Sequence, residues 1–216
     1  MKKIKYLSYL LIFIFIKSGR SESFIDGNLH SIHFKETEDK GILENLEIDE
    51  ASGIVASEEH PDSLWVINDS NDLNRIFLID KTGGGRNEFF LKGIQNRDWE
   101  TLAFWKNPKE ENYIYIGDIG DNEGKFTEYF IHRFKEPKSN SIEFYTGMIK
   151  NVETLRFELP DGSRDMESMF VDQINGDMYL ISKREDKKHL YKIPDKAFQK
   201  KKLTSAQFVM RLKFSK

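Results

Sequence analysis

The chain has 216 residues, of which 38% are hydrophobic, 13% aromatic and 32% charged, and its formal net charge is −3. This composition is typical of a globular protein, and the length is enough for one domain with a sizeable core. The absence of cysteine excludes a disulfide framework, a thiolate metal site and a cysteine nucleophile.

The N-terminal segment has the features of a signal peptide. Three lysines lie within residues 1–5, an apolar run follows at 6–16, and Ser21 and Ser23 offer small residues for cleavage. The apolar run is shorter than the roughly 20 residues that a spanning helix needs. We therefore expect residues 1–23 to be a cleaved signal peptide and residues 24–216 to be periplasmic or secreted. An uncleaved membrane anchor is the alternative.

The net negative charge of residues 24–216 argues against nucleic acid as a partner. Without residues 1–23 the chain has 28 basic and 35 acidic residues, and an acidic exported protein is a poor candidate for binding phosphates. We expect no nucleic-acid partner, and no membrane insertion after cleavage. Residues 196–216 contain seven basic residues and no acidic one, a pattern typical of a solvated face.

Three similar segments follow in chain order. Each begins with an acidic motif and continues with short aromatic and β-branched runs separated by turn residues, which predicts strands. The repeats cover about residues 48–94, 98–135 and 165–195, and we expect an insertion at about 136–156. Only residues 195–202 look helical. We expect Trp65, Trp99 and Trp105, with Ile67, Ile116 and Ile181, to pack between the sheets.

The spacing of the repeats predicts an all-β fold, a β-propeller. Their openings at residues 50, 98 and 165 are compatible with propeller blades of about 40–50 residues, the second spacing including an insertion. Residues 24–216 are enough for about four blades, so the chain is either a complete small propeller or an incomplete, truncated one. A β-sandwich is the runner-up, but it gives no reason for a repeated acidic opening.

Five motifs carry a family resemblance. They are E-x-S-G-I near residue 50, W-V-I-N-D-S at 65–70, D-W-E-T-L-A at 98–103, G-D-I-G-D-N at 117–122 and R-D-M-E-S-M at 164–169. In this order the chain resembles exported bacterial β-propellers of the phytase-like and SdiA-regulated families, over about residues 48–195. The glycine usual after the glutamate of their D-x-E-G signature is Thr101 in one repeat and Ser168 in another. The resemblance implies the propeller fold more strongly than an activity.

The acidic openings are the best candidates for ligand binding. If the repeats superpose, carboxylates from several repeats converge, where like charges raise each other's pKa unless a cation or a basic group joins them. Ca²⁺ takes six to eight oxygen ligands and suits such a ring. The expected ligand-binding residues are Glu50, Asp98, Glu100, Asp165, Glu167, Lys183 and Arg184. The alternative is that the acids hydrogen-bond to backbone amides in a structural role.

A second candidate set follows the middle strands. Asp69, Asp118 and Lys183 fall at the ends of similar strand motifs, and Asp121 and Asn122 follow in a glycine-rich loop. Loops at one rim of a rigid β scaffold commonly carry binding sites. We therefore expect Asp69, Asp118, Asp121 and Asn122 as metal ligands. The alternative is a turn whose side chains satisfy the backbone.

A further question is which face of each innermost strand carries the glutamate and which carries the apolar residue two positions later. Glu100 and Leu102 would share one face under strict alternation, as would Glu167 and Met169. A β-bulge after each glutamate would resolve the conflict. Because Thr101 and Ser168 replace the glycine that would favour a bulge, the sequence does not decide whether the bulges form.

Three functions stay open, and the sequence does not decide whether the protein is an enzyme. They are binding of an unidentified small molecule or protein, a Ca²⁺-dependent phosphoesterase, and a truncated fragment without function. No G-x-S-x-G, H-E-x-x-H or P-loop motif occurs in the chain.

Overall fold

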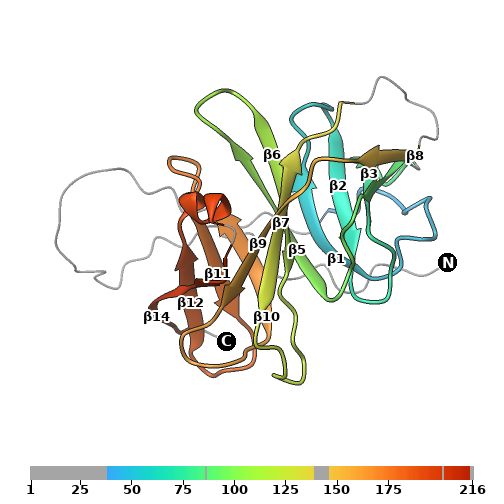
Figure 1. The fold of residues 1–216 in the computed structure, drawn as a ribbon. Coiled ribbons are helices and arrows are strands. Elements are labelled where there is room, and N and C mark those ends of the chain that lie inside the picture. The colour runs from blue at the N-terminus through green and yellow to red at the C-terminus, as the bar shows by residue number, and fades with distance from the viewer. Residues whose placement is uncertain (1–37, 86, 139–145, 201, 215–216) are drawn as a thin grey trace, which may run out of the picture.

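The computed structural model describes residues 38–85, 87–138, 146–200 and 202–214 (Figure 1). The expected signal peptide at 1–23 lies outside these residues. The described chain consists of strands and one short 3-10 turn, η1 (Asp195–Gln199), so the all-β class is confirmed. No helix among the described residues is long and apolar enough to cross a membrane.

The strands form three open sheets that follow one another along the chain (Figure 1). The first sheet contains β1 (Ala51–Ala56), β2 (Ser63–Asn68), β3 (Arg75–Asp80), β4 (Asn87–Leu91) and β8 (Thr146–Ile149). The second contains β5 (Trp99–Lys106), β6 (Asn112–Asp118), β7 (Tyr129–Lys135), β9 (Glu153–Glu158) and β13 (Thr204–Ser205). The third contains β10 (Met166–Val171), β11 (Met178–Ser182), β12 (Lys188–Ile193) and β14 (Gln207–Leu212).

Each sheet is built on four antiparallel strands in a simple meander, β1 to β4, β5–β6–β7–β9 and β10–β11–β12–β14. Hairpin turns of the expected kind join neighbouring strands. In the β10–β11 hairpin, Gly176 has a φ of 76°, which favours glycine. The Asn175 side chain accepts a hydrogen bond from the Asp177 amide at 2.8 Å.

Two outer edges receive an additional strand in parallel orientation. β8 pairs with β4, and β13 pairs with β9. Since β9 is the fourth strand of the second sheet, this repeat extends beyond residue 135. The stretch expected to be an insertion, 136–156, therefore contains β8 and the first part of β9.

The first strands of the three sheets, β1, β5 and β10, lie side by side. Ser52 donates a hydrogen bond from Oγ to the backbone oxygen of Trp99 at 2.7 Å. A Cβ on Gly53 would lie 2.7 Å from the backbone nitrogen of Leu102, so only glycine allows β1 to approach β5 this closely. The acidic openings of adjacent sheets are thereby brought together.

Apolar side chains fill the spaces between neighbouring sheets. Trp65, Ile67, Trp99 and Ile116 are buried between the first and second sheets, and Trp105 lies in the core shared by the second and third. The prediction for the three tryptophans is confirmed. Ile181 is only half-buried. It pairs with Leu190 on one face of the third sheet, while their neighbours Leu180 and Tyr191 occupy the buried face.

Candidate metal centre

The same irregularity occurs at the start of each innermost strand. The pairing register shifts between Ala51 and Gly53, between Trp99 and Thr101, and between Met166 and Ser168. Ser52, Glu100 and Glu167 are thus the extra residues of three equivalent β-bulges. Glu100 and Glu167 occupy equivalent positions on neighbouring strands, as predicted, and the bulge forms although Thr101 and Ser168 replace glycine.

The bulges explain how a glutamate and a core residue follow each other without conflict. After the bulge at Glu100, Leu102 is 6% exposed within the core between the first two sheets. The carboxylate of Glu100 instead joins the acids of the other openings. Strict alternation would have placed both side chains on one face.

Five carboxylates gather at this point in two groups that share Glu100. One group is Asp69, Asp98 and Glu100, and the other is Glu100, Asp165 and Glu167. Within each group the candidate ligand oxygens all lie within 4.8 Å of one another. Four of the five come from the strand openings predicted to bind a ligand, and Asp69 follows β2. The two acidic groups could hold a metal ion.

The carboxylates differ in how they are satisfied. Asp165, 3% exposed, accepts hydrogen bonds from the Asp121 amide at 2.9 Å and from Arg184 Nε at 2.7 Å. Glu167 accepts one from Lys183 Nζ at 2.5 Å. Glu100 is 6% exposed, and no donor among the described residues reaches its carboxylate. Glu100, the acid that both groups share, is therefore the one without a hydrogen-bond donor. Burying a carboxylate without such a partner costs free energy of folding.

Burial and crowding shift the proton affinities of two of these acids. Burial, followed by the charges of Glu167 and Asp69, raises the pKa of Glu100 to about 9. Burial and the neighbouring Asp69, whose side chain shares a hydrogen bond with Asp98, raise the pKa of Asp98 to about 6. Both shifts have the sign expected for carboxylates that lack a compensating cation.

Two basic side chains lie against the cluster, as predicted. Lys183 pairs with Glu167, and Arg184 pairs with Asp165. Burial disfavours the charged ammonium of Lys183, but the bond to Glu167 and the charges of Glu100 and Asp165 outweigh it, so its pKa is raised. The side chains of Lys183 and Arg184 are 45% and 53% exposed, and neither forms a hydrogen bond with Glu100.

A glycine that the sequence analysis did not single out makes room for the cluster. A Cβ on Gly120 would lie 2.5 Å from Asp98 Cγ and Oδ2 and from Glu100 Oε1. A side chain at this position would displace the two carboxylates. The signal was present in the motif G-D-I-G-D-N, but it indicated only a turn.

The other predicted metal ligands lie elsewhere. Asp118 does not share the register of Asp69 and Lys183: it pairs with Trp99, and its equivalents are Asn68 and Ser182. The sequence alignment of the three strand motifs is shifted by one residue in the second repeat. In the structure Gly117 is equivalent to Ile67 and Ile181. Asp118 is 2% exposed, accepts a hydrogen bond from the Asp98 amide at 3.1 Å and pairs with Arg97.

Asp121 has the structural role considered as the alternative. Its carboxylate accepts hydrogen bonds from the amides of Lys125 at 2.8 Å and Phe126 at 2.9 Å, and from Tyr129 Oη at 3.0 Å. Asn122 accepts one from Arg184. Neither residue belongs to the two acidic groups.

Glu50 is exposed and also lies outside the acidic groups, although its backbone oxygen accepts a hydrogen bond from the Asp69 amide at 3.0 Å.

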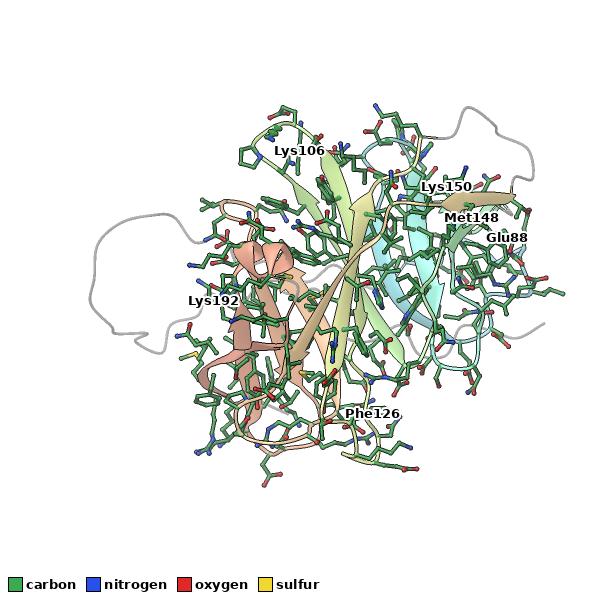
Figure 2. All side chains as sticks on the ribbon, viewed as in Figure 1. Glu88, Lys106, Phe126, Met148, Lys150 and Lys192 are labelled. Carbon is green, nitrogen blue, oxygen red and sulfur yellow. The ribbon has the colours of Figure 1, made fainter. Side chains whose placement is uncertain are left out.

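The loop with Phe126 lies at the end of the second sheet opposite the β5–β6 hairpin at Lys106 (Figure 2). The acidic openings are at the Phe126 end, since Asp98 precedes β5 and Lys106 ends it.

The chain matches no protein-family model, no curated protein and no solved structure.

Proposed function

We propose that this protein is an extracytoplasmic binding protein of the β-propeller type, with a divalent-cation site formed by the five clustered carboxylates. The observation that carries the proposal is Glu100: its carboxylate is 6% exposed, lies among four other acids and has no hydrogen-bond donor among the described residues. Without a cation the pKa of Glu100 is raised to about 9, and a cation between the two groups would favour its ionised form.

The donor set favours Ca²⁺. The ligand atoms are carboxylate oxygens alone, with no histidine in either group, and oxygen-only sites suit Ca²⁺, Mg²⁺ and Mn²⁺ rather than Zn²⁺ or Cu²⁺. Ca²⁺ accepts an irregular shell of six to eight oxygens, whereas Mg²⁺ demands near-octahedral geometry. Glu100 would be the shared ligand, with Asp69 and Asp98 on one side and Asp165 and Glu167 on the other.

The ligand we propose is a small molecule or a protein group with negative charge. Such a group would bind between the cation and the ammonium and guanidinium of Lys183 and Arg184, which already lie against the cluster. The propeller proposal rests on the repeated motifs and is supported by three successive meanders with adjacent first strands. The location outside the cytoplasm rests on the sequence of residues 1–23.

Thermal unfolding with added cations tests the site. We expect Ca²⁺ to raise the Tm of the EDTA-treated protein by several degrees at millimolar concentration, because an ion that binds only the folded state stabilises it by mass action. The Glu100→Gln variant should lose this rise, while Glu123→Gln, a change at an exposed carboxylate paired with Lys125, should keep it. An equal rise in wild type and Glu100→Gln would overturn the proposed site.

A Ca²⁺-dependent phosphoesterase is the second candidate, favoured by the two basic side chains beside the acids. In such a reaction a water molecule attacks phosphorus, the ester P–O bond breaks and the alcohol leaves with a proton. The test is phosphate release from an aryl phosphate with Ca²⁺ or EDTA. No turnover above background would reject this activity and would leave the cation site untouched.

A further inference from the structure

The imidazole of His189 lies between a carboxylate and a guanidinium in the third sheet. His189 is on β12 and is 6% exposed, and the ring of Phe208 packs edge-on against it with centroids 5.3 Å apart. Its Nδ1 is 3.0 Å from Oδ2 of Asp161, in the loop between β9 and β10, and its Nε2 is 3.2 Å from Nε of Arg211 on β14. β12 and β14 are adjacent antiparallel strands, in which His189 pairs with Arg211 (Figure 1). The imidazole therefore connects the β9–β10 loop to the edge strand of this sheet.

The two neighbours determine which ring nitrogen carries the proton. A guanidinium only donates hydrogen bonds, so Nε2 of His189 accepts from Arg211 and carries no proton. An ionised carboxylate only accepts, so the proton is on Nδ1 and points to Asp161. The hydroxyl of Tyr191, 3.1 Å from Nδ1, already donates to Oδ1 of Asp161 at 2.8 Å. The two hydrogen bonds of the ring can therefore exist together only while the imidazole is neutral.

The other charged groups around the ring keep their charges near neutral pH. Burial opposes ionisation of Asp161, but the hydrogen bonds from Tyr191 and Arg164 outweigh it, so the pKa of Asp161 is lowered. Arg164 pairs with Asp161 and with Glu185. Arg211 has no carboxylate partner among the described residues, and its guanidinium is always protonated. Of these groups, only the imidazole is of a type that changes its charge between pH 5 and 8.

A second proton on the ring would act oppositely on its two sides. A protonated Nε2 would direct its N–H at the N–H of Arg211, so this hydrogen bond would be lost and two cations would face each other. On the other side the bond to Asp161 would become a charge-assisted pair, which is stronger than the neutral bond. Arg211 is exposed and can turn into solvent, whereas Asp161 is held by Arg164 and Tyr191. β14 is therefore the element that protonation would loosen.

We propose that His189 and Arg211 form a proton-sensitive latch, which holds β14 on the third sheet while the imidazole is neutral and releases it when the imidazole is protonated. Two features of β14 make it responsive to one hydrogen bond. Five of its six side chains are exposed, so little apolar burial holds the strand. Its pairing with β12 shifts between Leu190 and Tyr191, so a bulge separates the pair of His189 and Arg211 from the first part of the ladder. The latch is independent of the cation site, because none of its residues belongs to the two acidic groups.

Amide hydrogen exchange of the full-length protein in EDTA, at about pH 5.5 and about pH 7.5, tests the latch. After correction for the intrinsic effect of pH on exchange, we expect residues 209–212 to exchange about tenfold faster at the lower pH, because local opening of a strand exposes its amides. Residues 159–164 should exchange more slowly there, because the pair of His189 and Asp161 becomes stronger. Unchanged exchange at 209–212, or a change of the same sign across the whole third sheet, would overturn the proposal.

Three variants assign the response to this pair of residues. His189→Gln retains an oxygen that can accept from Arg211 but cannot be protonated, so residues 209–212 should stay protected at both pH values. Arg211→Met, a change at an exposed position, removes the donor and should give fast exchange at both. His60→Gln, at a histidine of the β1–β2 turn that bonds to the Pro137 oxygen, is the matched control and should keep the response of the wild type. A pH response at 209–212 that persists in His189→Gln or in Arg211→Met, or that disappears in His60→Gln, would overturn the latch.

Discussion

Glu136, immediately after β7, accepts a hydrogen bond at 2.8 Å from the indole Nε1 of Trp65, which belongs to β2 of the neighbouring sheet. The same buried carboxylate accepts hydrogen bonds from Ser57 Oγ at 2.5 Å and from the amides of Glu58 and Glu59, each at 3.2 Å. One side chain of the second sheet therefore fixes the β1–β2 turn of the first.

Replacing this acceptor should loosen the contact between the two sheets. In Glu136→Gln an amide NH₂ would face at least one of the four donors, so we expect a loss of about 1–3 kcal/mol in the free energy of unfolding. Urea denaturation followed by tryptophan fluorescence measures it. The matched change Glu123→Gln, at an exposed carboxylate, should stay within about 0.5 kcal/mol of wild type; a similar loss in both would contradict the role of Glu136.

The stability of the cation-free protein should depend on pH through Glu100. Its pKa is raised from 4.5 to about 9, so the folded protein retains a proton that the unfolded chain releases. The stabilisation is fully present below pH 4.5 and is lost as the pH rises through about 9. In EDTA we expect the free energy of unfolding to fall by on the order of 2–4 kcal/mol between pH 5 and 9.

The Glu100→Gln variant isolates this effect. Asp98, with a pKa of about 6, contributes with the same sign in the lower part of the range, so the variant should keep a shallow slope below about pH 6 and become nearly flat above it. Urea midpoints at several pH values, in EDTA, supply the comparison. Parallel curves for wild type and variant would show that Glu100 titrates normally.

Gly120→Ala should damage the cluster as well as the fold. The added Cβ would lie 2.5 Å from atoms of Asp98 and Glu100, so we expect a loss of about 1–3 kcal/mol together with the loss of the Tm rise that Ca²⁺ produces. Gly176→Ala is the matched control, because its Cβ would lie 2.7 Å from the ring of Trp105 in the β10–β11 hairpin, at the end of β10 opposite its acidic opening. It should destabilise the protein but retain the response to Ca²⁺.

Asp121→Asn tests whether this acid belongs to the turn or to the metal. Three donors reach its carboxylate, one of them the hydroxyl of the buried Tyr129. We expect the variant to lose about 1–3 kcal/mol, with the Ca²⁺-induced Tm rise unchanged in size. A variant of normal stability that no longer responds to Ca²⁺ would return Asp121 to the metal ligands.

The strands and their order were predictable because the information is local. Short aromatic and aliphatic runs such as 64–67 and 178–181 are bounded by turn residues, and the repeated acidic openings marked β1, β5 and β10 as equivalent. These openings also identified four of the five clustered acids. Gly120 was not identified, because its necessity comes from two carboxylates that precede it in the chain and approach it only in the folded state.

Pairings that depend on distant segments were not predictable. Nothing in Thr146–Ile149 indicates that it pairs with β4 rather than forming part of an insertion. The prediction that Asp118 is equivalent to Asp69 and Lys183 was wrong for a different reason. Its strand motif resembles those ending in Asp69 and Lys183, but pairing with Trp99 fixes its register one residue earlier than the motif suggests. No motif marked Glu136, because its four partners all lie in the first sheet, 71 to 79 residues earlier in the chain.

The parallel strands β8 and β13 also determine the order in which the sheets are completed during synthesis and where the chain can be truncated. The edge of the first sheet stays unpaired until residues 146–149 have been synthesised, and the edge of the second until residues 204–205 have been. A chain that folds from its N-terminus would complete each sheet only while the next one is forming. For the same reason no cut between successive meanders releases a finished unit, because each cut would remove the strand that closes the sheet before it.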